Sequence, residues 1–121
     1  MRISTGKYPP ELRLRAPASF QHVWKTGRRV SVPLMAIMSC KNDLGHPRLG
    51  ISIPKKNIRL AVDRNRFKRL AREAFRLRQN KLAAQDFVVV TYKGAEALTP
   101  IEQYQRVNAL WDLAEARLII P

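Results

Sequence analysis

Cysteine, histidine and acidic residues are scarce in this chain of 121 residues. Cys40 is the only cysteine, which rules out an internal disulfide and fits a reducing compartment, so we expect a cytoplasmic protein. Nine Asp and Glu stand against 23 Lys and Arg, and the formal net charge is +14. So large an excess indicates an anionic partner, which is a nucleic acid, an anionic membrane or an acidic protein.

Long apolar runs are also missing. No segment approaches the roughly 18 apolar residues that span a bilayer, and no apolar stretch follows the basic N-terminus as it does in a secretory signal. Apolar residues still make up 45% of the chain, which excludes a disordered basic tail. We expect residues 1–121 to form one soluble domain with a real core. The first 15 of these residues are expected to be a basic, loosely held arm.

Groups that perform catalysis are scattered along the chain. His22 and His46 have no partner nearby in the sequence, and the acids form no cluster that could hold Mg²⁺. No Cys-x-x-Cys, His-Glu-x-x-His or glycine-rich phosphate loop is present. We therefore predict no catalytic residue and no metal site in this chain, which is expected to bind a partner.

The first half of the chain predicts a helix and two strands. Pro17 suits the first turn of a short helix that stops at Gly27. Residues 30–40 are β-rich with Pro33 inside, so they predict one strand that is bulged or near an edge. Residues 48–53 alternate strictly between apolar and small or polar residues, which is typical of a half-buried strand. The Asn, Asp, Gly and Pro of the loop between them favour a hairpin.

The second half predicts two helices around a buried strand. A helix capped by Asn57 is expected to run to about Arg78, with apolar residues at spacings of three and four. Residues 86–92 form a continuous apolar strand. Thr99-Pro100-Ile101-Glu102 is a capping box that opens the last helix. The order α-β-β-α-β-α predicts an α+β layer sandwich in which helices pack on a small mixed sheet.

The helix at residues 58–78 is unusually basic. It holds eight Arg and Lys but only two acids, Asp63 and Glu73. Five polar side chains lie opposite its apolar face on a helical wheel: Asn65, Lys68, Arg69, Arg72 and Arg76. A solvated helix usually interleaves Glu with Lys, so the repulsion here indicates an outside polyanion. A guanidinium group can bond to two phosphate oxygens at once, which favours RNA as the partner. A membrane would need an exposed apolar face on this helix, but that face is needed for the core.

Residues 48–76 carry a resemblance to a known family. They read RLGISIPKKNIRLAVDRNRFKRLAREAFR and closely resemble the protein subunit of bacterial ribonuclease P. The shared pattern is a strand ending in Lys-Lys, followed by a helix with Arg-Asn-Arg-x-x-Lys-Arg-x-x-Arg. The PASF helix, the Gly-His-Pro-Arg turn, the DFVVV strand and the final helix also lie where the family places them.

The resemblance implies a role beside a catalytic RNA. In that family the RNA removes the 5′ leader of precursor transfer RNA with Mg²⁺ ions that the RNA holds, while the small protein docks on it and holds the leader. This implies two RNA partners, no obligate protein partner and no cofactor bound by the protein itself. It also implies a left-handed βαβ crossover around the basic helix.

Two groups of site residues follow from the resemblance. Contacts to the catalytic RNA are expected from Lys55, Lys56, Arg64, Asn65, Arg66, Lys68, Arg69, Arg72 and Arg76. A cleft between the first helix and the sheet is expected to hold the single-stranded leader on Phe20, Trp24, Met38, Arg48 and Ser52. Bases stack well on aromatic rings, and a methionine is a weaker platform.

Two other functions remain open from the residues alone. The same basic helix suits a ribosomal or RNA-chaperone module that binds another structured RNA. An autonomous protein nuclease is the third hypothesis, and the scattered histidines and acids count against it. Phe20 and Trp24 likewise fit the core by spacing alone, and only the resemblance favours partial exposure toward a cleft.

Overall fold

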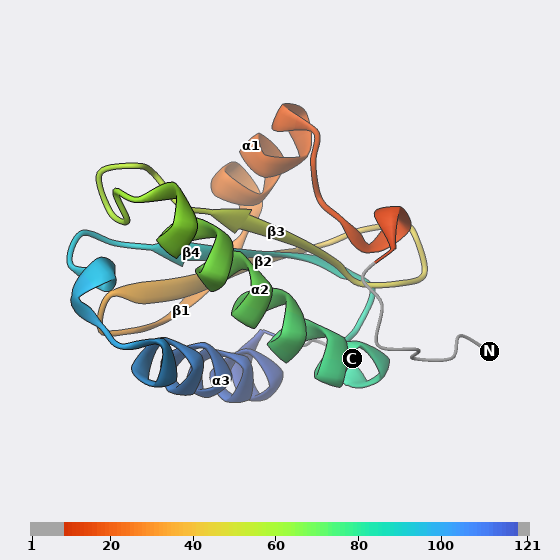
Figure 1. Ribbon diagram of the computed structural model, residues 1–121. Coiled ribbons are helices and arrows are strands. Elements are labelled where there is room, and N and C mark those ends of the chain that lie inside the picture. Colours follow the sequence, from red (N-terminus) through yellow and green to blue (C-terminus); the bar gives the residue numbers. More distant parts are fainter. Residues whose placement is uncertain (1–8, 119–121) are drawn as a thin grey trace.

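The computed structural model describes residues 9–118, which form one four-stranded sheet with three α-helices (Figure 1). A short 3₁₀ turn at Pro10–Leu12 comes first. The regular elements then follow in the order α1 (Pro17–Thr26), β1 (Arg28–Val32), β2 (Met35–Lys41), β3 (Arg48–Ser52), α2 (Ala61–Arg78), β4 (Gln85–Thr91) and α3 (Pro100–Arg117). Within these residues no helix has the length and apolar character needed to cross a bilayer.

The sheet has the strand order β1-β2-β4-β3. β2 pairs antiparallel with both β1 and β4, whereas β3 runs parallel to β4. Parallel neighbours need a crossover, and α2 supplies it between β3 and β4. The predicted α+β class with a mixed sheet is therefore confirmed, and the expected βαβ connection contains the basic helix.

Two predictions about the strands were wrong. Residues 30–40 form two strands, because Pro33 and Leu34 make a two-residue turn that pairs Val32 with Met35. Proline suits the first central position of such a turn, and Leu34 takes a positive φ of 75° at the second. The second error is the hairpin between residues 40 and 48, since β4 lies between β2 and β3. β4 is buried along its whole length, which suits a central strand that pairs with a neighbour on each side, here β2 and β3.

The sheet separates two apolar clusters. The larger one joins α2 and α3 to one face, where Trp111 packs against Phe75 and Phe87 with ring centroids 5.9 and 5.1 Å away. The smaller one lies under α1 and includes Val23 and Val88. Figure 1 shows α1 and α3 on opposite sides of the strands. The predicted apolar face of α2 is confirmed by this packing.

The N-terminal segment is held more closely than expected. Residues 1–8 lie outside the described range, but Leu12 and Leu14 are buried, and the Leu14 N–H donates to the carbonyl of Leu49 at 2.9 Å. Leu12 belongs to the larger cluster and Leu14 to the smaller one, so the chain crosses the outer edge of β3 from one face to the other. A loosely held arm is therefore wrong for residues 9–15.

The two predicted helix caps have different outcomes. α2 begins after Leu60, and Asn57 does not cap it, because its Nδ2 donates to the carbonyl of Thr91 at 2.8 Å in a buried position. The capping box of α3 is present in full: Thr99 Oγ1 accepts from the Glu102 N–H, and the Glu102 carboxylate accepts from the Thr99 N–H. These bonds satisfy backbone donors that the helix itself leaves unpaired.

Candidate nucleic-acid interface

One face of α2 is apolar and buried, which turns the predicted RNA-binding side chains outward. Phe67, Ala71, Ala74 and Phe75 are fully buried. On the other side of the helix the polar residues are exposed or half-buried: Arg64, Asn65, Arg66, Lys68, Arg69, Arg72 and Arg76. Lys55 and Lys56 are exposed in the turn that joins β3 to α2. These nine residues, the α2 stripe, are the ones that the sequence assigned to the catalytic RNA.

Arg64, Arg66 and Arg76 of the α2 stripe bond to groups within the chain. Arg66 pairs with Asp63 at 3.1 Å, and Arg76 pairs with Glu73 through two hydrogen bonds that lower the pKa of the Glu73 carboxyl below its ordinary value. Both pairs are exposed, where such contacts contribute only a few tenths of a kcal/mol. Arg64 Nη1 donates to the carbonyls of Ile58 and Arg59, at 2.9 and 2.7 Å, and so steadies the segment before the helix.

Five side chains of the α2 stripe have no partner within the described part of the chain. Within residues 9–118, no hydrogen bond or ion pair is made by the side chains of Lys55, Lys56, Asn65, Lys68 and Arg69. Four of them are cations. Their mutual repulsion is uncompensated by the described part of the chain, which is the electrostatic footprint of a surface that binds a polyanion.

The residues expected in the leader cleft share the sheet face under α1. Phe20 and Met38 pack against the smaller apolar cluster, and Trp24 is 40% exposed on the same helix as Phe20. The ring of Phe20 lies directly over Gly50, where a Cβ would come within 2.6 Å of Phe20 Cζ. Glycine at this position therefore lets the ring approach the strand.

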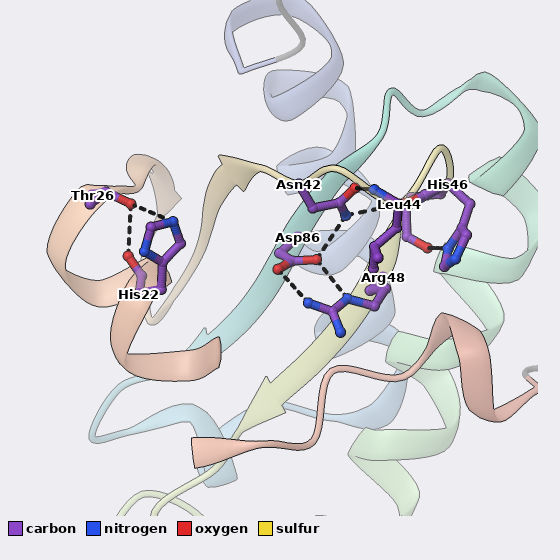
Figure 2. A network of polar contacts seen from close by, with 8 residues as sticks. His22, Thr26, Asn42, Leu44, His46, Arg48 and Asp86 are labelled. Atoms are coloured by element: carbon purple, nitrogen blue, oxygen red, sulfur yellow. Dashed lines mark hydrogen bonds and ion pairs between the residues drawn. The ribbon is translucent and has the colours of Figure 1, made fainter. Parts of the chain in front are cut away.

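Arg48 and Ser52 flank Gly50 on β3 and point to the same face by strand alternation. Arg48 is committed to an internal pair: its Nε and Nη2 donate to the two carboxylate oxygens of Asp86, at 2.9 and 2.8 Å (Figure 2). Asn42 Nδ2 donates to the same carboxylate at 2.9 Å. The three bonds compensate the buried carboxylate of Asp86, and the hydrogen bonds between Arg48 and Asp86 raise the pKa of the Arg48 guanidinium above its ordinary value.

A cationic pocket of about 200 Å³ lies at the outer edge of β3 and was missed by the sequence. Arg13, Arg15, Lys68 and Arg72 line it together with Phe20 and Gly50. None of the described residues that line it is an acid. Residues 1–15 were predicted to be a loosely held arm, so this role of Arg13 and Arg15 was not recognised. The two leucines of the segment, Leu12 and Leu14, were the available signal, because both are buried and anchor it.

The two histidines lie apart. His22 is exposed on α1 near Thr26, whose Oγ1 donates to the His22 carbonyl at 2.8 Å, and His46 lies in the loop before β3 (Figure 2). Between residues 9 and 118, no three His, Cys, Asp or Glu side chains come together as metal ligands do. The exposed cations of α2 lie on one side of the β3 edge, and Phe20 of α1 lies on the other.

Comparisons with known proteins agree on one family. The profile of the family described as Ribonuclease P matches residues 8–115. The ribonuclease P protein component of Vibrio cholerae is 45% identical over 109 residues, which cover 90% of this chain and 92% of the relative. That of Salmonella newport is 47% identical over 86% of this chain and 87% of the relative. A solved structure of the Staphylococcus aureus RNase P protein superimposes with a TM-score of 0.80 at 29% identity, covering 90% of this chain and 98% of the other.

Proposed function

This chain belongs to the ribonuclease P protein family, and we propose that two of its surfaces hold two different RNAs. Membership makes the chain the RNA-binding protein subunit of an endoribonuclease that matures the 5′ ends of transfer RNA, with an RNA subunit as its partner. The α2 stripe docks on the RNA subunit. The face under α1 holds the 5′ leader of precursor transfer RNA.

The uncompensated cations of α2 are the observation that carries this proposal. Lys55, Lys56, Lys68 and Arg69 have no partner within residues 9–118, so phosphates are their natural counter-ions. An 18-residue helix is about 27 Å long, which lets it follow an RNA backbone over several nucleotides. The proposal leaves bond cleavage to the RNA subunit, where Mg²⁺ would supply the chemistry, while this chain binds and orients.

The aromatic residues of α1 support the leader site. Phe20 and Trp24 offer rings on which unpaired bases stack, with about 1–3 kcal/mol for each base. The cationic pocket at the β3 edge joins this face to α2, because Phe20 and Gly50 line it beside Lys68 and Arg72. A leader on the α1 side would thus reach the docked RNA subunit over continuous positive charge. We further propose that residues 1–121 act as one domain in the cytoplasm.

Reconstitution tests the proposal. Purified protein is added to its RNA subunit, and KM is measured for a precursor with a leader and for a matched substrate without one. The protein should lower KM or the Mg²⁺ requirement for the substrate with a leader and much less for the other. Equal effects on both substrates would overturn the leader site, and no effect at near-physiological salt would overturn the proposal as a whole.

A further inference from the structure

An apolar groove lies between α2 and the first turns of α3, away from the sheet face that α1 covers. Leu70, Pro100, Ile101 and Tyr104 supply its apolar lining, and its volume is about 700 Å³. That volume falls in the range of sites that bind small ligands, and it accommodates a nucleotide. The groove shares its rim with the α2 stripe through Arg66 and Arg69.

Ile101 is the most conspicuous part of this groove. It is 71% exposed, the largest exposed fraction among the large hydrophobic residues within the described range. Its position in the first turn of α3 is fixed by the capping box, but the box itself needs only Thr99 and Glu102. Tyr104, one turn later, is half-buried and packs against the larger apolar cluster. An aliphatic side chain and a ring thus lie side by side, open to a partner.

The charges on the rim decide which partner fits. Arg69 has no partner among the described residues, and Arg66 has only the exposed pair with Asp63. Two guanidinium groups beside an apolar floor are complementary to a flat ring that carries a phosphate. An apolar peptide segment would leave these cations unpaired, whereas a nucleotide satisfies both parts.

We infer that this groove binds an unpaired nucleobase of the RNA subunit, with the base on Tyr104 and Ile101 and its phosphate at Arg66 and Arg69. The inference rests on the proposed docking of the α2 stripe, because only an RNA held there would place a base within reach. Single-stranded positions are required, since a base within a helix cannot be splayed onto a protein ring.

Glu73 determines which end of the groove holds the base and which end holds its phosphate. Its carboxylate lines the groove one turn beyond Arg69, and Arg76 holds it ionised by lowering its pKa. Because Glu73 already neutralises Arg76 at that end, a phosphate is attracted to the other end of the groove, where Arg66 and Arg69 lie. A carboxylate accepts a hydrogen bond from an exocyclic amine, so a base with an amino group is favoured over uracil.

Four variants test the groove by their affinity for the RNA subunit over a series of salt concentrations. Tyr104→Leu keeps apolar volume but removes the ring, and it should weaken binding about 5- to 150-fold, as expected for one lost stacked base. The slope of log K against log salt should stay unchanged, since no charge is lost. Tyr104→Phe should bind like the unmodified protein. Ile101→Ser should weaken binding without a change in melting temperature. Leu44→Ser is the control: Leu44 is exposed in the loop before β3, outside the groove, so this variant should keep both the affinity and the melting temperature of the unmodified protein.

A fifth variant separates this inference from the proposal on which it rests. Lys68→Ala removes a stripe cation outside the groove, so it should weaken binding and reduce the salt slope by about one. If Lys68→Ala has this effect while Tyr104→Leu and Ile101→Ser bind normally, the groove inference is overturned and the docking of α2 stands. If Lys68→Ala is also without effect, the docking itself is overturned.

Ultraviolet cross-linking of the unmodified complex should join Tyr104 to one unpaired nucleotide, and a Tyr104 peptide without any cross-link would contradict the inference.

Discussion

Arginines with the same charge differ in role because their surroundings differ. Arg48 gives two hydrogen bonds to Asp86, and Arg64 gives two to backbone carbonyls, whereas Arg69 makes none within residues 9–118. Internal bonds hold the first two side chains in place. Arg69 is available to a partner, so a substitution there should affect binding and leave folding intact.

Arg48→Ala is expected to destabilise the protein by about 3 kcal/mol. The substitution leaves the buried carboxylate of Asp86 with only the amide of Asn42, and an uncompensated buried charge is costly. Urea unfolding measures the loss. Arg28→Ala is the matched control, because Arg28 is an exposed strand arginine with no side-chain partner within the described residues, and it should change stability little. Equal stability of the two variants would contradict a structural role for Arg48.

Gly50→Ala should impair the leader site without unfolding the chain. The new Cβ would lie 2.6 Å from Phe20 Cζ and 2.9 Å from Phe20 Cε1, so the ring must move away from the strand. The KM for a substrate with a leader is expected to rise by up to about tenfold, the equivalent of one weakened stacking contact. Substrate without a leader is the control and should keep its KM. A similar rise for both substrates would show that the ring does not contact the leader.

The sequence predicts the faces of residues better than their partners. Apolar spacing predicted that one face of the helix at residues 58–78 belongs to the core, and Phe67 and Phe75 on that face are fully buried. It did not reveal that Arg48 is held by Asp86, which lies 38 positions away and becomes a neighbour only through the sheet. Contacts between distant positions depend on strand order, which no local pattern contains.

At the level of the helix, α2 offers a matched pair of substitutions. Arg78 bonds to Asp112, Glu115 and Asn108 on α3, whereas Arg69 has no side-chain partner within the described residues. Arg69→Ala should weaken RNA binding, reduce the salt slope by about one and keep the melting temperature. Arg78→Ala should lower the melting temperature and keep the salt slope. Filter binding and thermal unfolding of both variants give the answer, and the reverse pattern would refute the assignment of the two roles.

The capping box of α3 predicts a dependence of stability on pH. The Thr99 N–H and hydroxyl hydrogen bonds lower the pKa of the Glu102 carboxyl in the folded protein. Its stabilising effect is therefore complete above the unfolded value of about 4.3 and is lost as the pH falls through the lower folded value. Melting temperature should fall less steeply between about pH 5 and pH 3 in Glu102→Gln than in the unmodified protein.

Glu11→Gln is the control for this measurement. Glu11 is exposed and has no side-chain partner within residues 9–118, so the variant removes a carboxylate without touching a cap. If Glu102→Gln and Glu11→Gln follow the same pH curve, the capping box does not supply the acid sensitivity.

Helices were easier to predict than the strands between them. The bounds of α1 and the C-terminal end of α2 follow from proline, glycine and apolar spacing, and the structure confirms both. The turn at Pro33 and Leu34 was hidden because apolar residues continue on both sides of it, and a leucine with a positive φ has no signature in a sequence. Asn57 was mistaken for a cap because its real acceptor, the carbonyl of Thr91, belongs to another element.

In the whole molecule, the two proposed RNA surfaces meet at one edge of the sheet. β3 is an edge strand, and it carries α2 on one side and the site of Phe20 on the other. The N-terminal segment crosses this edge and brings Arg13 and Arg15 beside Lys68 and Arg72. The basic helix and the family resemblance predicted both surfaces, and these remain predictions. Their junction follows from the parallel pairing of β3 with β4, which could not be read from local patterns.

The most direct test of this account is the affinity for the RNA subunit as a function of salt, measured for the unmodified protein and for a triple variant, Lys55→Ala with Lys68→Ala and Arg69→Ala. About six neutralised phosphates should give a slope of log K against log salt of roughly −4 to −5. The triple variant should fold with an unchanged melting temperature, bind far more weakly and lose about two to three units of slope. A triple variant with the affinity and slope of the unmodified protein would show that α2 does not hold the RNA by its unpaired cations.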